Sequence, residues 1–235
     1  GAASVPTVTT TAAGTTTYYV SQTTNGCEGP RALITVTVKA KPAAPAVTAT
    51  YTYCQNDIPS ALSATGANLL WYNVATGGTG AASAPSVITT AAAITTYYVS
   101  QTVNGCEGPR ASITVTVKAR PAAPTVTPTY TYCQNDIPSA LSATGANLLW
   151  YNVATGGTGS ASTPSVSTTA AGTTTYYVSQ TVSGCEGPRA SIIVTVYATP
   201  ALPTVAFPAI EYCQDEIIST PLLATGSNLL WYTVA

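Results

Sequence analysis

The sequence predicts an all-β protein made of tandem two-sheet sandwiches, and three observations lead to this prediction. Threonine and valine dominate its extended segments, whereas the helix-favouring residues Glu, Lys, Gln and Met are scarce or absent. Several segments are short apolar or alternating runs bounded by Gly, Pro and Asn. The same motifs return every 79 residues, as at Cys27, Cys106 and Cys185.

Proline-rich segments mark the predicted domain boundaries. They read AKPAAP, ARPAAP and ATPALP at residues 40–45, 119–124 and 198–203, and proline fixes the backbone and removes amide donors. We therefore predict two complete domains and two partial ones: a C-terminal half-domain at 1–40, complete domains at 41–119 and 120–198, and the N-terminal part of a domain at 199–235. We favour a segment of a longer extended array, with head-to-tail completion between copies as the alternative.

Within residues 41–119, the strands are predicted in chain order. Residues 59–65 and 68–74 form two strands separated by Gly66, and residues 95–103 and 112–119 flank the turn motif NGCEGPR. In the last strand, valine and isoleucine alternate with threonine, which buries one face and exposes the other to water. About seven short strands, with a tryptophan on the third, indicate an immunoglobulin-like sandwich.

Aromatic and aliphatic residues on these strands divide into core and surface candidates. Tryptophan on such a strand usually fills the core, so the predicted core residues are Trp71, Trp150, Trp231, Leu69, Leu148, Val115 and Val194. Adjacent tyrosines on a strand must point to opposite faces. One tyrosine of each pair is therefore a candidate for surface contact, the pairs being Tyr97 with Tyr98 and Tyr176 with Tyr177.

Six cysteines at repeating positions are disulfide candidates: Cys27, Cys54, Cys106, Cys133, Cys185 and Cys213. Pairing within a repeat gives Cys54 to Cys106 and Cys133 to Cys185. The usual strand order places these partners at opposite ends of a sandwich, too far apart for a bond. The alternative joins neighbouring domains, for example Cys27 to Cys54.

Composition argues against most other chemistry. The chain has no histidine and only 6% charged residues, so we predict no enzyme activity, no cofactor and no metal site. Asp57 and Asp136 are interpreted as solvated turn residues, and Glu107 is predicted to pair with Arg110 across an exposed turn. With a net charge of -1 and scattered basic residues, nucleic acid is not an expected partner. Apolar runs are too short for a membrane-spanning segment.

Four motifs carry a family resemblance along the whole chain: YCQND, LLWYNVATGG, TTTYYVSQTVNGCEGPR and ITVTV, each with small variations between repeats. They resemble the Ig-like domains of secreted Bacteroidetes surface proteins, including giant gliding-motility adhesins exported by the type IX secretion system. The resemblance implies an extracellular stalk or adhesin at the cell surface.

The leading functional hypothesis is a stalk or spacer segment of a cell-surface adhesin or filament, supporting attachment or gliding, with neighbouring repeats as its partners. A second hypothesis is a glycan-binding module, in which outward aromatics or the VATGGTG loop recognise surface polysaccharide. A third is a fibre subunit that self-associates head to tail through its half-domains.

Overall fold

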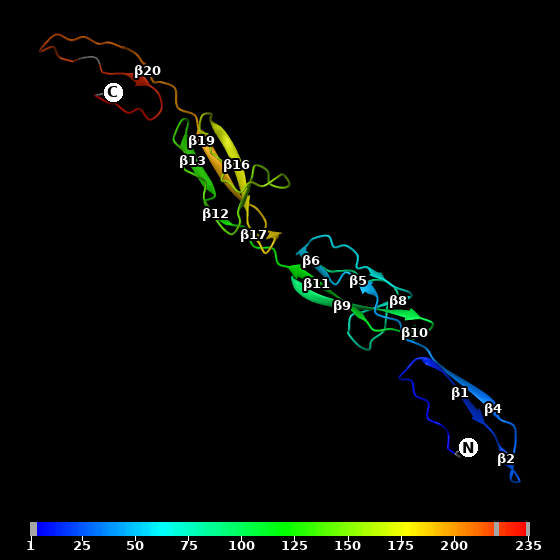
Figure 1. Ribbon diagram of the computed structural model, residues 1–235. Coiled ribbons are helices and arrows are strands. Elements are labelled where there is room, and N and C mark those ends of the chain that lie inside the picture. Colours follow the sequence, from blue (N-terminus) through cyan, green and yellow to red (C-terminus); the bar gives the residue numbers. More distant parts are fainter. Residues whose placement is uncertain (1–3, 219–220, 234–235) are drawn as a thin grey trace. The chain divides into compact units, whose positions relative to one another are not determined.

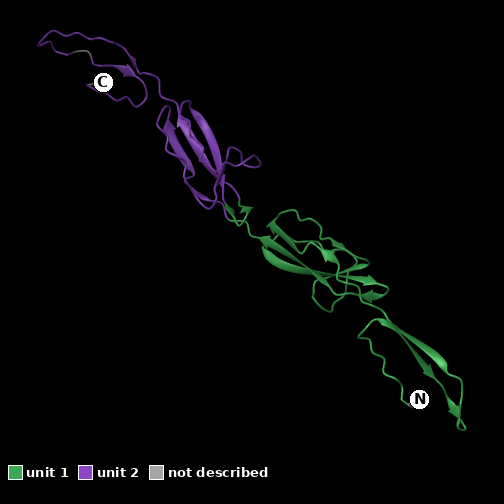
Figure 2. Ribbon diagram, in the orientation of Figure 1, with its two compact units in different colours: residues 1–121, 181–187 green, residues 122–180, 188–235 purple. Residues whose placement is uncertain are grey.

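The computed structural model describes residues 4–218 and 221–233, and within these ranges it contains strands and no helix. The all-β prediction is therefore confirmed. Two compact units make up the chain (Figure 2): Gly1–Pro121 with Thr181–Gly187, called unit 1, and Ala122–Gln180 with Pro188–Ala235, called unit 2. In the described part of the chain, no helix is long and apolar enough to cross a membrane.

Unit 1 contains a complete sandwich, called sandwich 1 (Figure 1). Its main sheet has the strand order β8, β9, β11, β6, in which β6 runs parallel to β11 and the other pairs are antiparallel. The second layer holds a short antiparallel pair, β5 with β7. The bounds are β5 Ala46–Val47, β6 Thr50–Cys54, β7 Ala64–Thr65, β8 Leu69–Tyr72, β9 Ala93–Val103 and β11 Ala111–Lys118.

The alternating pattern of β11 builds the core of sandwich 1. Ile113, Val115 and Val117 face inward beside Val99 of β9 and Trp71 of β8, and all five are buried. The second layer covers them with Leu62, Val47 and Ala64, among others. Threonines at the intervening positions of β11 are more exposed, because successive residues of a strand point to opposite faces.

Unit 2 contains sandwich 2, which repeats this architecture. Its main sheet has the order β13, β19, β16, β15, again with a parallel pair, β13 with β19. Trp150 and Val194 are buried in its core with Val178 and Ile192. The bounds are β12 Thr125–Val126, β13 Thr129–Cys133, β14 Ala143–Thr144, β15 Leu149–Tyr151, β16 Gly172–Ser179 and β19 Ala190–Tyr197.

The Asn-Gly and Ser-Gly steps form two-residue hairpin turns. Asn104 and Gly105 have φ of 52° and 79° between β9 and β10 (Cys106–Glu107). Ser183 and Gly184 have φ of 53° and 83° between β17 (Thr181–Val182) and β18 (Cys185–Glu186). Positive φ at both central residues is the type I′ geometry whose twist matches the flanking strands. The β17–β18 hairpin belongs to unit 1.

The segments at the two ends of the sequence contain fewer strands among the described residues. In residues 4–40, β1 (Gly14–Val20) pairs antiparallel with β4 (Ala32–Val38), and β2 (Thr23–Thr24) pairs with β3 (Cys27–Glu28). In the C-terminal segment, β20 (Thr204–Val205) pairs with β21 (Ala224–Thr225).

The other predicted core residues differ in how deeply they are buried. Leu69 and Leu148 are half-buried and pack against the two cores. Trp231, for which the sequence also predicted a core position, is 58% exposed. Its segment has no counterpart of β9 or β11 among the described residues, so no sheet covers the indole.

Candidate functional site

A disulfide bond joins Cys54, the last residue of β6, to Cys185, the first residue of β18. Their Cα atoms are 5.6 Å apart, and 131 residues of sequence separate them. The Cys185 side chain is 1% exposed. The bond therefore holds the β17–β18 hairpin, defined here as residues 181–187, against the Cys54 end of sandwich 1 within unit 1.

This pairing differs from the predicted ones. Cys54 does not bond to Cys106, and Cys185 does not bond to Cys133, so the prediction of disulfides within a repeat is wrong. The reason is the strand order, because the end of β6 and the β10 turn lie at opposite ends of sandwich 1 (Figure 1). The alternative example, Cys27 to Cys54, is also wrong, although the observed bond does join cysteines of successive repeats.

Two basic side chains bind the backbone of the same hairpin. Lys118 Nζ donates to the Ser183 carbonyl at 2.9 Å, and Arg120 Nη1 donates to the Glu186 carbonyl at 2.6 Å. Carbonyl groups accept both hydrogen bonds, so the contact depends on the path of the hairpin backbone rather than on its side chains. The turn geometry therefore determines where the basic groups can bind.

Asp57 orients Arg120 for this contact. Its Oδ1 accepts from Arg120 Nη2 at 2.6 Å, and its Oδ2 accepts from the Cys54 backbone N–H at 2.8 Å. Arg120 Nε also donates to the Gln55 carbonyl at 2.8 Å. Asp57 is thus a turn residue, as interpreted, with an ion pair that the sequence did not reveal. At 38% and 35% side-chain exposure, the pair contributes about 0 to 1 kcal/mol.

The equivalent positions in the other repeats keep only part of this arrangement. Lys39 Nζ donates to the Asn104 carbonyl at 2.9 Å, which reproduces the Lys118 contact one repeat earlier. In the following repeat, Tyr197 and Thr199 stand where Lys118 and Arg120 would be. The two basic side chains that bind the hairpin backbone, Lys118 and Arg120, therefore have no basic counterparts in that repeat.

A second cluster surrounds Glu107, on the face of β8 and β9 that points away from the core. Tyr72 Oη donates to Glu107 Oε1 at 2.7 Å, and Ser100 Oγ donates to the same oxygen at 2.6 Å. These hydrogen bonds, that of Ser100 foremost, hold the pKa of Glu107 below its ordinary value of 4.5. Tyr72 and Ser100 are both buried, so the carboxylate gives their hydroxyl groups a partner.

Arg110 holds the loop that covers this face. Its Nη1 and Nη2 donate to the carbonyls of Val74 and Gly77 at 2.6 and 2.8 Å, and its guanidinium lies 3.2 Å from the centre of the Tyr72 ring. The predicted Glu107–Arg110 ion pair is not among the ion pairs of the described residues. Arg189 makes the equivalent contacts in sandwich 2.

A glycine makes the close approach of this loop possible. A Cβ atom at Gly80 would lie 2.7 Å from the Tyr72 Cζ and hydroxyl group and 2.9 Å from Leu70 Cβ. The motif LLWYNVATGG therefore folds back over its own tyrosine. The arginine of CEGPR holds the loop in this position through its hydrogen bonds to the loop carbonyls. In residues 4–40, Arg31 instead lies 3.5 Å from Glu28.

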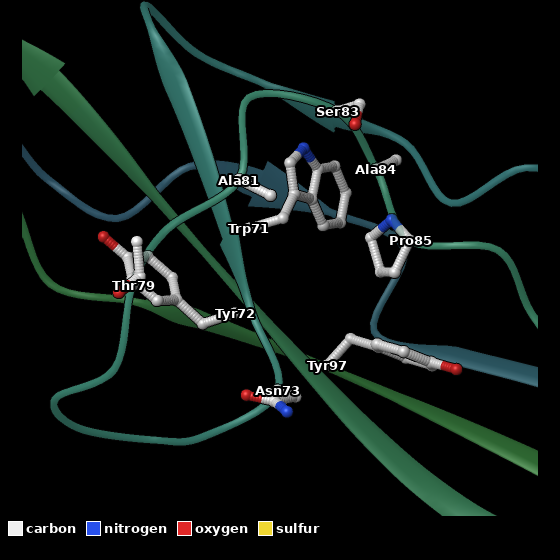
Figure 3. Close-up of a pocket in the computed structure, with 9 residues that line it drawn as sticks. All are labelled: Trp71, Tyr72, Asn73, Thr79, Ala81, Ser83, Ala84, Pro85 and Tyr97. Carbon is white, nitrogen blue, oxygen red and sulfur yellow. The ribbon is translucent and has the colours of Figure 1, made fainter.

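A shallow pocket of about 340 Å³ opens beside the core tryptophan of sandwich 1 (Figure 3). Trp71, Tyr97 and Pro85 form its apolar wall, and Asn73, Thr79 and Ser83 supply polar groups. The pocket is thus lined by both aromatic and polar side chains.

Within each tyrosine pair, the two side chains lie on opposite faces of the sheet. Tyr97 packs against the core and Tyr98 points to the opposite face, and both are half-buried. Tyr176 and Tyr177 repeat this arrangement in sandwich 2, with Tyr176 Oη donating to the Ser165 carbonyl at 3.3 Å. Among the described residues, no three Cys, Asp or Glu side chains cluster as metal ligands.

Comparison with protein families identifies the repeats. The family described as "Ig-like domain CHU_C associated" matches residues 42–118 and 121–197. No curated protein sequence matches the chain.

Several solved structures match the chain at low sequence identity. The insect immune protein hemolin matches with 10% identity and a TM-score of 0.31, covering 78% of this chain and 56% of that chain. The tandem Ig repeats of Dlar match with 10% identity and a TM-score of 0.25, covering 67% and 100%. Human CDH23 EC21-23 matches with 12% identity and a TM-score of 0.27, covering 79% and 80%.

Proposed function

The chain belongs to the Ig-like domain CHU_C associated family, and from this premise we propose that it is a spacer segment of an extracellular adhesin. The observation that carries the proposal is the Cys54–Cys185 disulfide, which closes a loop of 131 residues. A spacer must keep its length when it is pulled, and a covalent link between repeats limits how far the enclosed residues can extend.

The size of this limit follows from chain geometry. A fully extended chain spans at most about 3.3 to 3.6 Å per residue. The 131 residues between the two cysteines would therefore contribute about 430 to 470 Å of length if both sandwiches unfolded without the disulfide. With the disulfide intact, this length stays inaccessible to a pulling force.

Single-molecule force spectroscopy of the whole chain, pulled at its two ends, tests the mechanical role. We expect the reduced chain to reach a contour length about 430 to 470 Å greater than the oxidised chain. A Cys133→Ser variant is the matched control, because Cys133 is a free thiol at the position equivalent to Cys54. Equal contour lengths in the oxidised and reduced chains would contradict the proposal.

We propose the cell surface as the location, in a protein that supports attachment or gliding. The support is the family match, the disulfide and the resemblance of the repeat motifs to exported adhesins. Antibodies against this segment should label intact producing cells and lose that labelling when type IX export is blocked. Labelling that appears only after cells are permeabilised would argue against this location.

We also propose the Pro-rich segments as the domain boundaries, so that residues 41–119 and 120–198 are the repeating units. Limited proteolysis tests this, with first cleavages expected within residues 40–45, 119–124 and 198–203. Early cleavage inside β9 or β16 would place the boundaries elsewhere.

The pocket beside Trp71 favours a second candidate function, recognition of a surface polysaccharide. Aromatic side chains with convergent amide and hydroxyl groups can bind a sugar ring by stacking and hydrogen bonding. A glycan array is the direct test, with Asn73→Ala as the variant because Asn73 lines the pocket without belonging to the core. We expect saturable binding that the variant weakens about tenfold, equivalent to one lost hydrogen bond.

A further inference from the structure

Polar contacts and a disulfide bond act on the same short hairpin, residues 181–187. The hydrogen bonds from Lys118 and Arg120 end on carbonyl groups that lie on either side of Cys185 in the chain. Between them, the Gly184 carbonyl oxygen lies 3.8 Å from Cys54 Sγ. The two hydrogen bonds involve no sulfur atom, so they can place the two cysteines side by side whether or not the disulfide has formed.

Arg120 is held in position by residues of sandwich 1 itself. Its Nε donates to the Gln55 carbonyl at 2.8 Å, and its Nη2 donates to Asp57 Oδ1 at 2.6 Å. Asp57 is fixed in turn, because its Oδ2 accepts from the Cys54 backbone N–H at 2.8 Å. A side chain that is already ordered loses less conformational entropy when it binds. The hairpin therefore meets a binding group that sandwich 1 has oriented in advance.

The preceding repeat shows the same lysine contact without a disulfide. Lys39 Nζ donates to the Asn104 carbonyl at 2.9 Å, while Cys106, two residues further along the chain, is not disulfide-bonded. Asn104 and Ser183 have φ of 52° and 53°, so both lysines bind the first residue of the same type of turn. The lysine contact is thus a property of the turn backbone and does not require a bond between sulfur atoms.

We propose that Lys118 and Arg120 form a recognition site that captures the hairpin before oxidation and so selects Cys185 as the disulfide partner of Cys54. In the dithiol chain the hairpin exchanges between a docked and an undocked position, and the two basic side chains raise the docked fraction. The disulfide then locks the docked position. By thermodynamic linkage, a contact that favours docking favours the disulfide by the same factor.

The bond forms in two exchange steps, with oxidised glutathione as the oxidant. The thiolate of one cysteine attacks a glutathione sulfur, which breaks that S–S bond and releases one glutathione thiolate. The thiolate of the other cysteine attacks the mixed disulfide and releases the second glutathione. The two cysteines lose two protons and two electrons, and one glutathione disulfide becomes two thiols. Docking favours the second step, because only that step requires the two cysteines to meet.

The inference does not rest on the proposed spacer function, since it concerns how the bond forms and not what the bond resists. Its test is the equilibrium between the dithiol chain and its disulfide in mixtures of reduced and oxidised glutathione. The equilibrium constant equals the effective concentration of one thiol at the other. It is measured by acid quenching and mass spectrometry of the Cys54–Cys185 peptide. The sample is the whole 235-residue chain with its other cysteines replaced, as Cys27→Ser, Cys106→Ser, Cys133→Ser and Cys213→Ser.

The double variant Lys118→Met with Arg120→Met removes both hydrogen bonds to the hairpin backbone. It should lower the effective concentration about tenfold or more. Lys118→Arg keeps a cationic donor at the same position and should change the constant by less than about threefold. Amide hydrogen exchange in β11 shows whether sandwich 1 stays folded in each variant. An unchanged constant in a folded double variant, or an equal loss in Lys118→Arg, would overturn the proposal.

Substitutions in the turn test recognition of the backbone without touching sandwich 1. Gly184→Ala strains a residue whose φ is 83°, so the turn relaxes away from the geometry that presents its carbonyls, and the constant should fall about tenfold. Ser183→Asn should leave the constant unchanged, because asparagine adopts positive φ readily and Asn104 holds this position one repeat earlier. Equal constants for the two turn variants would contradict recognition of the backbone, even if the double variant failed to fold.

Discussion

One arginine in each complete repeat shows how a single side chain can stabilise a loop and an aromatic ring at once. Arg110 binds two loop carbonyls and covers the Tyr72 ring, while Glu107 binds the Tyr72 hydroxyl group. The two charged residues thus act on one tyrosine from different sides, and the recurrence of CEGPR with LLWYNVATGG reflects that shared contact. The guanidinium fork is needed because it can reach two carbonyls while it stacks on the ring.

Replacing Arg110 with lysine is therefore expected to destabilise sandwich 1. An ammonium group cannot keep both carbonyl hydrogen bonds and the flat contact with Tyr72, so the free energy of unfolding should fall by about 1 to 3 kcal/mol. Denaturant unfolding followed by tryptophan fluorescence measures this. Arg31→Lys is the control, because the Arg31 side chain is 66% exposed and lies beside Glu28; it should change stability by less than about 0.5 kcal/mol.

The lowered pKa of Glu107 predicts how stability depends on pH. Because Ser100 and Tyr72 donate to the carboxylate, the folded state binds a proton less readily than the unfolded state. The stabilisation is complete above about pH 4.5 and is lost as the pH falls through the lowered pKa.

Glu107→Gln should reduce the loss of stability at acid pH, since the amide does not titrate. Thermal unfolding from about pH 6 to about pH 3 would show a smaller fall in Tm for the variant than for the parent chain. An equally steep fall in both would show that Glu107 does not contribute to the acid sensitivity.

At the scale of elements, the repeat offers pairs of identical residues in different surroundings. Val99 of β9 and Val20 of β1 occupy the same repeat position in the same YYVSQT motif. A full sandwich surrounds the first, whereas the second lies on a two-stranded hairpin. Their contributions to stability should therefore differ although their local sequence does not.

Val99→Ala should lower the free energy of unfolding of sandwich 1 by about 2 to 3 kcal/mol, from lost burial and a residual cavity. Val20→Ala should cost less than about 0.5 kcal/mol, because Val20 is 53% exposed. Chemical denaturation of the two variants in parallel gives both values, and equal losses would contradict the difference in burial.

At the scale of the whole molecule, connectivity between repeats is separate from the stability of each sandwich. Cys54 and Cys185 belong to neither of the two core clusters. The chain-entropy model gives about 5 kcal/mol for closing a 131-residue loop, which applies in full only if the enclosed residues unfold together. Removing the bond should therefore act first on the docked hairpin.

We expect the double variant Cys54→Ser with Cys185→Ser to release residues 181–187 while both cores stay folded. Amide hydrogen exchange should accelerate at least tenfold at the hairpin and at residues 54–57, and remain unchanged in β9 and β16. Loss of protection in either core would show instead that the disulfide is required for the sandwiches themselves. Cys213→Ser is the control, since Cys213 is a free thiol.

The sequence was sufficient for the local features. Alternation of Val and Ile with Thr predicted β11 and its inward face, and the Asn-Gly step predicted the hairpin turn, because both signals act between residues close in the chain. The sequence was insufficient to predict β6, because its TYTYC motif alternates two residue types that both suit strands. It was also insufficient for the bounds of β7, a strand that was predicted at residues 59–65 and is observed at residues 64–65. Parallel pairing of β6 with β11 depends on a strand about sixty residues away.

Repeat length, all-β class, the position of the tryptophans and the number of cysteines were thus determined by the sequence itself. The tertiary structure alone decided which cysteines meet, what Arg110 and Glu107 bind, and why Trp71 is buried but Trp231 is not. The physical reason is that side-chain periodicity is a local property, whereas a disulfide, a covered ring or a closed core requires particular strands from distant parts of the chain to lie side by side.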